Sequence, residues 1–188
     1  FKLMNQKSLG IEPFYPTIDL ALTYQNETFH ANNSNRLKPS GLQEAPLVTL
    51  NHGHEHNIYS LVMIDLDTLP MEQQETDYFY LHWAIVNIEG TDVTTGLELA
   101  HYEPPSPEYN SGLHRYMFLL FDQSSDFTPE QFDELDEMFA HRDKFSHIEF
   151  MRKFHLAAPV GLNGFYSSWD ETCDDMHAAI GYVPLSHY

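Results

Sequence analysis

Hydrophobic residues along this chain fall mainly into short runs that are separated by acidic and turn-forming segments. Short runs rich in Val, Ile and aromatic side chains favour β-strands. We therefore expect strands at residues 18–24, 45–50, 58–63, 79–88, 97–102, 117–121 and 162–169. The run at 79–88 is the most apolar of these, which predicts a central strand.

The C-terminal third changes to a helical period. Thr128 as N-cap, Pro129 in the first turn and Gln131 three residues after the cap predict a helix start. Apolar side chains then recur at helical spacing up to Phe139 and again over 145–154, and 170–180 is expected to be a short helix. Strands that come first and helices that come late predict a mainly β (α+β) domain over residues 1–188, with its helices at the periphery.

Two carboxylates follow the apolar run at 58–63. Asp65 and Asp67 are two residues apart, so they would share one face if the chain stayed extended. Like charges at that spacing raise each other's pKa unless a cation or donors intervene. His82 and His114, which flank or begin later apolar runs, are the candidate partners. The sequence predicts that these three stretches form the walls of one anion-handling cavity.

Composition limits the possible partners. The chain has 188 residues with 42% hydrophobic content, enough for a sizeable core. Nine Lys and Arg stand against 28 Asp and Glu, for a net charge of −19. Such a field repels nucleic acid and anionic membranes, although a local basic pocket could still hold one small anion. No apolar run approaches the length of a membrane span, and no signal peptide is visible.

Three histidines occur at alternate positions in one polar segment. His52, His54 and His56 would share a face in an extended chain, where imidazoles could hold Zn, Cu or Ni. The Gly and Asn residues around them instead favour a turn, and a resident metal needs three or four ligands on a rigid frame. The sequence therefore predicts neither a resident metal nor a cofactor, with metal uptake by this turn as the alternative.

Two other features bear on localisation. Asn26 and Asn32 each begin an N-glycosylation acceptor pattern, which favours a secreted glycoprotein, with the cytoplasm as the alternative. Cys173 is the only cysteine, so an internal disulfide is impossible. We expect an unpaired thiol, with a cross-link between two chains as the alternative.

Four motifs in order carry a resemblance to the phosphatidylethanolamine-binding protein family, which includes the Raf kinase inhibitor proteins and the flowering-time regulators of plants. They are Asp65-x-Asp67, Leu81-His82-Trp83-x-x-x-Asn87-Ile88-x-Gly90, Tyr102-x-Pro104-Pro105-x-Pro107 and Gly112-x-His114-Arg115-Tyr116-x-Phe118. Residues 81–90 and 111–123 also resemble the mitochondrial large-subunit ribosomal member of that superfamily. The net charge of −19 argues against that location, because ribosomal proteins that touch RNA are usually basic.

The resemblance implies a β-sandwich with a small pocket that takes phosphate-like anions, including phospholipid head groups. Carried over residue by residue, the pocket would be lined by Asp65, Asp67, His82, Pro104, Pro105, His114 and Tyr116. We assign Trp83 to the core and Arg115 to a structural ion pair. Leu66, Thr68 and Leu69 stand where the family typically has Pro, Ala and Pro, which implies a less rigid loop with Leu69 near the mouth of the pocket.

The function expected from these features is a non-enzymatic module that binds an anion or phospholipid head group and binds or regulates other proteins. One alternative is a structural or assembly subunit with a degenerate pocket, and another is a protease inhibitor. A hydrolase is disfavoured because Ser60 and Ser106 lack the sequence context of an activated nucleophile.

Overall fold

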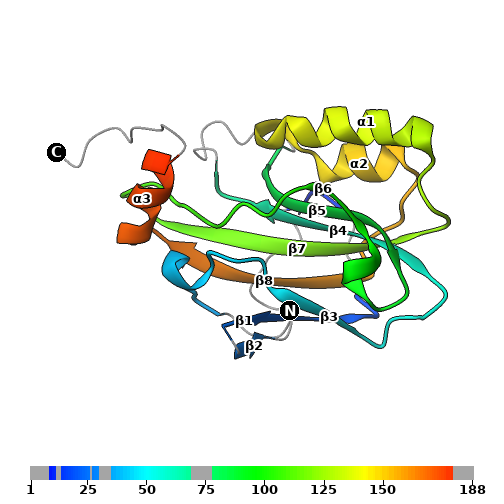
Figure 1. Ribbon diagram of the computed structural model, residues 1–188, viewed down its shortest axis with the longest axis horizontal. Coiled ribbons are helices and arrows are strands. Elements are labelled where there is room, and N and C mark those ends of the chain that lie inside the picture. Colours follow the sequence, from blue (N-terminus) through cyan, green and yellow to red (C-terminus); the bar gives the residue numbers. More distant parts are fainter. Residues whose placement is uncertain (1–8, 12–13, 26, 30–34, 69–77, 180–188) are drawn as a thin grey trace.

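Strands dominate the fold and form two antiparallel sheets (Figure 1). The structure is a computed structural model that describes residues 9–11, 14–25, 27–29, 35–68 and 78–179. The larger sheet has the order β6-β5-β4-β7-β8, with β4 (Ile58–Asp65), β5 (Tyr80–Glu89), β6 (Leu97–Ala100), β7 (Leu113–Gln123) and β8 (Gly161–Ser168). The smaller sheet has the order β2-β1-β3, with β1 (Asp19–Tyr24), β2 (Glu27–Phe29) and β3 (Leu47–Asn51).

Helices cover the outer face of the larger sheet. Figure 1 shows helices α1 (Pro129–Ala140) and α2 (His147–Lys153) on one side of this sheet and the smaller sheet on the other, while α3 (Glu171–Ala179) lies at one end. Short 3₁₀ helices are η2 (Pro39–Gly41), η4 (Val93–Thr95) and η5 (Arg142–Lys144). The predicted capping box at Thr128 and Gln131 is confirmed, with the Gln131 side chain accepting the Thr128 backbone N–H at 2.9 Å. A mainly β sandwich with peripheral helices is therefore confirmed.

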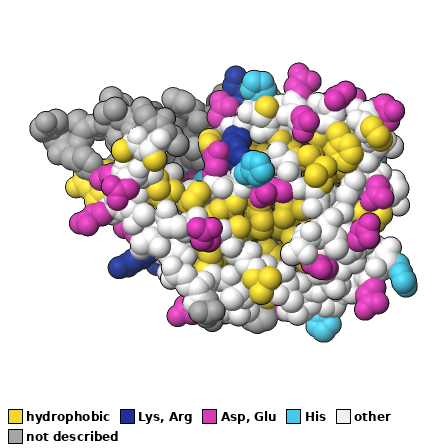
Figure 2. Space-filling view, in the orientation of Figure 1, with side chains coloured by type: hydrophobic (Ala, Val, Ile, Leu, Met, Phe, Trp, Pro, Cys, Tyr) yellow, Lys and Arg dark blue, Asp and Glu magenta, His cyan; other side chains and the backbone are white. Residues whose placement is uncertain are grey.

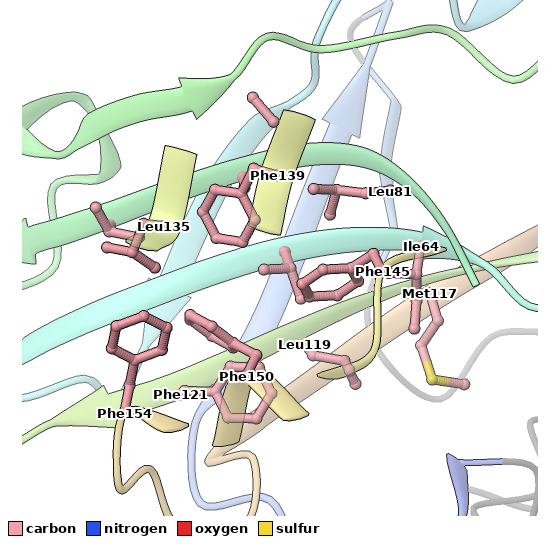
Figure 3. Packing of buried hydrophobic residues seen from close by; sticks show 14 of the residues in the cluster. Ile64, Leu81, Met117, Leu119, Phe121, Leu135, Phe139, Phe145, Phe150 and Phe154 are labelled. Carbon is pink, nitrogen blue, oxygen red and sulfur yellow. The ribbon is translucent and has the colours of Figure 1, made fainter. Parts of the chain in front are cut away.

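The larger sheet buries apolar side chains on both faces, as expected for strands that read as nearly continuous hydrophobic runs. The core between the sheets includes Trp83, as predicted, together with Phe118 and Phe165. The core under the helices is rich in phenylalanine, and Figure 3 shows Phe139, Phe145 and Phe150 gathered against the strands. Each fully buried Phe stabilises the fold by about 1.5–3 kcal/mol relative to exposure.

Several predicted boundaries differ from the structure by two residues or more, and two of these differences have a clear physical cause. β7 begins at Leu113 and not at Met117, because β4 and β8 pair with its polar first residues and extend the strand. α2 begins at His147 and not at Phe145, because the Ser146 side chain caps the helix by accepting the Glu149 N–H. Phe145 is extended, and its carbonyl accepts the Phe79 N–H at 2.8 Å.

Within the described ranges, each helix is too short or too polar to cross a bilayer.

Candidate functional site

The candidate site forms where central strand β4 ends. Asp65 is its last residue and pairs in register with Tyr80 on β5 and Tyr116 on β7. Met63 pairs with Trp83 while Ile64 pairs with Leu81, so His82 is the extra residue of a bulge in β5. A bulge re-aims a side chain out of the regular ladder. Strand pairing therefore brings His82 and the start of β7 to the same end of β4.

Asp65 and His114 form a buried pair. Nδ1 of His114 lies 2.7 Å from Oδ2 of Asp65, and the exposed fractions of the two residues are 6% and 3%. Nε2 of His114 lies 2.9 Å from Oγ of Ser111, so both ring nitrogens have an oxygen partner, as a protonated imidazole requires. The geometry therefore accommodates a histidinium beside an aspartate.

The pKa directions agree with that assignment. Burial opposes the charge on His114, but its hydrogen bond to Asp65 and the negative charges of Asp65 and Asp67 outweigh burial and raise its pKa. Burial likewise opposes the charge on Asp65, but the hydrogen bond and charge of His114 lower its pKa. Each partner stabilises the charged form of the other.

His82 has the opposite character. Burial lowers the pKa of His82, against the opposing charge of Asp65. Nδ1 of His82 lies 2.7 Å from the backbone carbonyl of Glu103, which can only accept, so Nδ1 carries a proton. In the neutral ring Nε2 is therefore an acceptor, and protonation makes it a donor.

Tyr116 completes the cluster from β7. Its ring is 1% exposed, lies 5.2 Å from the His82 ring edge-to-face and stacks on His114 at 6.4 Å, measured between centroids. Burial raises the pKa of Tyr116, and so do the charge of Asp65 and a hydrogen bond to it. The phenol therefore stays neutral beside the carboxylate.

Asp67 lies beyond the end of β4 and pairs with Arg115. The expectation that both carboxylates share one face was wrong, because β4 ends at Asp65 and the Asp67 N–H folds back onto Oδ1 of Asp65 at 2.8 Å. Asp67 instead receives two guanidinium N–H groups of Arg115, at 2.7 and 2.8 Å. The prediction that Arg115 makes a structural ion pair is confirmed.

The proline segment is tied to the same end of the sheet. Glu103 donates its N–H to the His82 carbonyl at 2.8 Å, and its own carbonyl is the partner of the His82 ring. Pro104 and Pro105 follow directly, the first half-buried and the second buried. The segment therefore stands next to His82, where the resemblance places it.

Three residues of this neighbourhood were missed. The Tyr80 hydroxyl donates to the Glu103 carboxylate at 2.8 Å, and Nε of Arg142 lies 3.2 Å from the same carboxylate. The two-residue spacing of Tyr80 and His82 on one strand was a usable signal. Nothing in the local sequence of Arg142 points to β5, because it reaches the site from the helical layer.

The remaining predicted positions lie elsewhere. His52, His54 and His56 are exposed and lie in the segment between β3 and β4, where His52 has φ +68°, so the turn predicted for them is confirmed. No group of three or more His, Cys, Asp or Glu arranged for a metal occurs among the described residues. Cys173 is buried and free of a disulfide, and burial raises its pKa to about 11.

Leu66 and Leu69, which stand where the family typically has Pro, differ in what the structure says of them. Leu66 is 3% exposed and packs in the core under the helices. Leu69 lies outside the described residues, as do the acceptor asparagines Asn26 and Asn32.

Two cavities that described residues line, of about 690 and 300 Å³, flank the segment 36–42, and neither includes Asp65, His82 or His114. The expectation of a hollow at Asp65 stays a prediction.

Comparisons with known proteins agree with this architecture. The family model described as Phosphatidylethanolamine-binding protein matches residues 25–163. "CEN-like protein 4" of Nicotiana tabacum is 32% identical over 86% of this chain and 87% of its own length. "26 kDa secreted antigen" of Toxocara canis is 30% identical over 86% of this chain and 62% of its own. The solved carboxypeptidase Y inhibitor, in complex with its proteinase, has a TM-score of 0.71 at 19% identity and covers 88% of this chain and 90% of its own. This chain belongs to the phosphatidylethanolamine-binding protein family.

Proposed function

We propose that this chain is a non-enzymatic binding protein that takes a small phosphate-like anion, such as a phospholipid head group, at the cluster of Asp65, His82, His114 and Tyr116. The observation that carries the proposal is the buried pair of Asp65 and His114 at the end of the central strand, 2.7 Å apart, with His82 beside it. Charged groups at such burial are unusual unless they are paired, and perturbed pKa values of this kind cluster at binding and catalytic sites.

The charges around the cluster favour some anions over others. The neighbourhood holds three acid–base pairs, which are Asp65 with His114, Asp67 with Arg115, and Glu103 with Arg142. These pairs leave no surplus positive charge, and Figure 2 shows acidic side chains spread over the surface of a chain with net charge −19. A dianion would meet uncompensated repulsion here. A monoanion or a zwitterion, in which phosphate and ammonium charges balance, matches the cluster better.

The chemistry of the described hydroxyls and thiol supports binding over catalysis. Ser60 donates to the Gln123 side chain at the far end of β4, and Cys173 is buried with a raised pKa. Neither meets the requirement of a nucleophile within reach of a base. Ser111 does contact an imidazole: its Oγ lies 2.9 Å from Nε2 of His114, whose Nδ1 faces Asp65, which is the connectivity of a Ser-His-Asp triad. The raised pKa of His114 favours a protonated ring, however, and a protonated ring cannot take the proton of the serine hydroxyl.

Calorimetry with phosphorylethanolamine and inorganic phosphate tests the proposal. We expect binding that strengthens from neutral to mildly acidic pH, because acid protonates His82 and also converts each phosphate from its doubly to its singly charged form. We also expect tighter binding of phosphorylethanolamine than of inorganic phosphate, because its ammonium offsets part of the phosphate charge. His114→Ala should weaken binding strongly. His101→Ala is the matched control, because His101 is an exposed histidine paired with Glu98. No heat with either ligand at both pH values would overturn the proposal.

Protein partners are a second part of the proposal. The fold is shared with a carboxypeptidase Y inhibitor, so we propose a direct assay of carboxypeptidase Y inhibition by this chain. A structural or assembly role predicts fixed-stoichiometry partners in native material. Light scattering that shows a clean monomer at high concentration, together with intact peptidase activity, would leave the head-group role alone.

Secretion is proposed on the two acceptor sequences, and a relative named as a secreted antigen supports it. Mass spectrometry of native material should find glycan on Asn26 or Asn32. Unmodified asparagines at both positions in native protein would favour the cytoplasmic alternative.

A further inference from the structure

Arg142 makes an unusual set of contacts with the candidate site. Its side chain is 19% exposed and comes from η5, directly after α1. Nη1 donates to the carbonyls of Leu81 and His82 at 3.1 Å each, and Nη2 donates to the carbonyl of His101 at 2.8 Å. Nε lies 3.2 Å from Oε1 of Glu103. One guanidinium therefore joins β5 to the segment that precedes the prolines.

These contacts fill a gap in the sheet. The paired part of β6 ends with Ala100 opposite Ala84, and direct pairing resumes only where the Glu103 N–H meets the His82 carbonyl. Buried carbonyls in such a gap need donors. A guanidinium offers five N–H groups in a fixed planar fork, so it can serve several carbonyls and a carboxylate at once. An ammonium on a flexible stem cannot reproduce that geometry.

We propose that Arg142 is a positioning residue for the anion site: it holds the β5 bulge and the Glu103 segment together, so that the Glu103 carbonyl fixes the ring of His82. The proposal rests on the function proposed above. His82 is held through its backbone carbonyl by Arg142 and through Nδ1 by Glu103, and Arg142 binds both residues. Arg142 thus acts through His82 and is not assigned a contact with the ligand.

The charge of Arg142 gives a second readout. The groups that face His82 or act on its charge are Asp65 from β4, Tyr116 from β7, Tyr80 on its own strand, Glu103 and Arg142. Among these, Arg142 opposes protonation of His82 and Glu103 favours it. Arg142→Gln should therefore raise the pKa of His82, and Glu103→Gln should lower it. Loss of structure cannot produce shifts of opposite sign.

The experiment combines calorimetry with NMR titration of the histidine rings, and the His82 signals are assigned with His82→Gln. With phosphorylethanolamine as the probe, we expect Arg142→Gln to bind about tenfold more weakly, the lower end of the loss seen when the orienting partner of a metal-binding histidine is removed. Arg142→Lys should keep the His82 pKa near that of the unmutated chain while recovering affinity only in part. Lys144→Gln, an exposed basic residue in the same η5 turn, should change neither quantity.

Two results would overturn the inference. One is an Arg142→Gln protein with unchanged affinity and an unchanged His82 titration. The other is a shift of the same sign in Arg142→Gln and Glu103→Gln. If the unmutated chain binds neither phosphorylethanolamine nor phosphate, the function proposed above fails by itself. The role of Arg142 is then decided by whether Arg142→Gln loses the hydrogen bond from Nδ1 of His82 to the Glu103 carbonyl, read from the ring-nitrogen NMR shifts of His82.

Discussion

The two ends of β4 solve the same structural problem with different chemistry. At each end β5 carries a bulge, one in the Val86–Asn87 step opposite Tyr59 to Leu61 and one at His82. At each end buried polar side chains from neighbouring strands fill the disturbed ladder. The end near Tyr59, which we call the neutral end, uses neutral amides and a hydroxyl. The end at Asp65, which we call the titratable end, uses groups that gain and lose protons.

The neutral end closes on itself. Gln123 accepts from the Ser60 hydroxyl at 2.5 Å and from the Asn87 N–H at 2.9 Å, and its amide donates to the Asn87 side chain at 2.9 Å. Asn87 also accepts the Phe127 N–H at 2.9 Å, which anchors the approach to α1. Its φ of +54° lies in the left-handed region, which Asn tolerates better than most residues. This network is satisfied internally and stabilises the fold.

The titratable end is held by partners whose charge depends on pH. Asp65 and His114 support each other, while His82 is kept neutral by burial. The comparison teaches that a bulge with buried polar groups does not by itself mark a binding site. The ability of those groups to change charge makes one end of β4 a candidate site and leaves the other structural.

Breaking the neutral network should have the largest effect on stability. Gln123→Ala leaves the Ser60 hydroxyl and the Asn87 N–H without their acceptor, which costs about 3 kcal/mol of unfolding free energy. Urea denaturation measures that loss. Calorimetry should find phosphorylethanolamine binding unchanged, and a binding loss equal to that of His114→Ala would contradict the separation of the two ends.

Removing the charge of Asp65 at the titratable end should lower the unfolding free energy less than Gln123→Ala does, and should weaken ligand binding more. Asp65→Asn keeps the size of the side chain but removes the charge that supports His114, which costs about 2 kcal/mol. We expect the pKa of His114 to fall and ligand binding to drop at least tenfold. NMR titration and calorimetry of one sample check both, and an unchanged His114 titration would argue against the pair.

The pH dependence of stability should differ between the ends by about 1–2 kcal/mol. Because the pKa of Asp65 is lowered, its contribution is present above about pH 4 and is lost as the pH falls through the lowered value. Because the pKa of His114 is raised, its contribution is full below about pH 6.5 and is lost as the pH rises through the raised value. The stability gap between the unmutated chain and Asp65→Asn should therefore be widest from about pH 4 to 6.5. A gap that is flat across pH would show that the pair is not ionised.

The smallest expected effects come from a matched pair of serines. Ser60→Ala removes a buried donor and should cost about 1 kcal/mol, whereas Ser111→Ala removes an exposed partner of His114 and should cost about 0.5 kcal/mol or less. Only Ser111→Ala should change the His114 titration. The reverse pattern, with Ser60→Ala moving His114, would mean that the two ends are coupled through β4.

Much of the fold was predictable because local patterns coincide with what the fold needs. The apolar run that became β5 and the capping box of Thr128 and Gln131 report on burial and on hydrogen bonds made within a few residues. The early start of β7 was missed because polar His114 and Arg115 look like a turn until β4 and β8 supply their pairing partners. The position of Asp67 was missed because β4 ends where its pairing with β5 and β7 ends, and that pairing is not visible in the local sequence.

The sequence by itself determined the order of the elements, the family and the residue types that gather at the end of β4, since those follow from periodicity and from motifs at fixed spacing. Only the tertiary structure decided that Asp65 bonds His114 while Asp67 bonds Arg115, and that Arg142 reaches His82 and Glu103 from the helical layer. The physical reason is that a hydrogen bond or ion pair between strands depends on register and on bulges. Both are fixed by long-range packing, which no local window of the sequence contains.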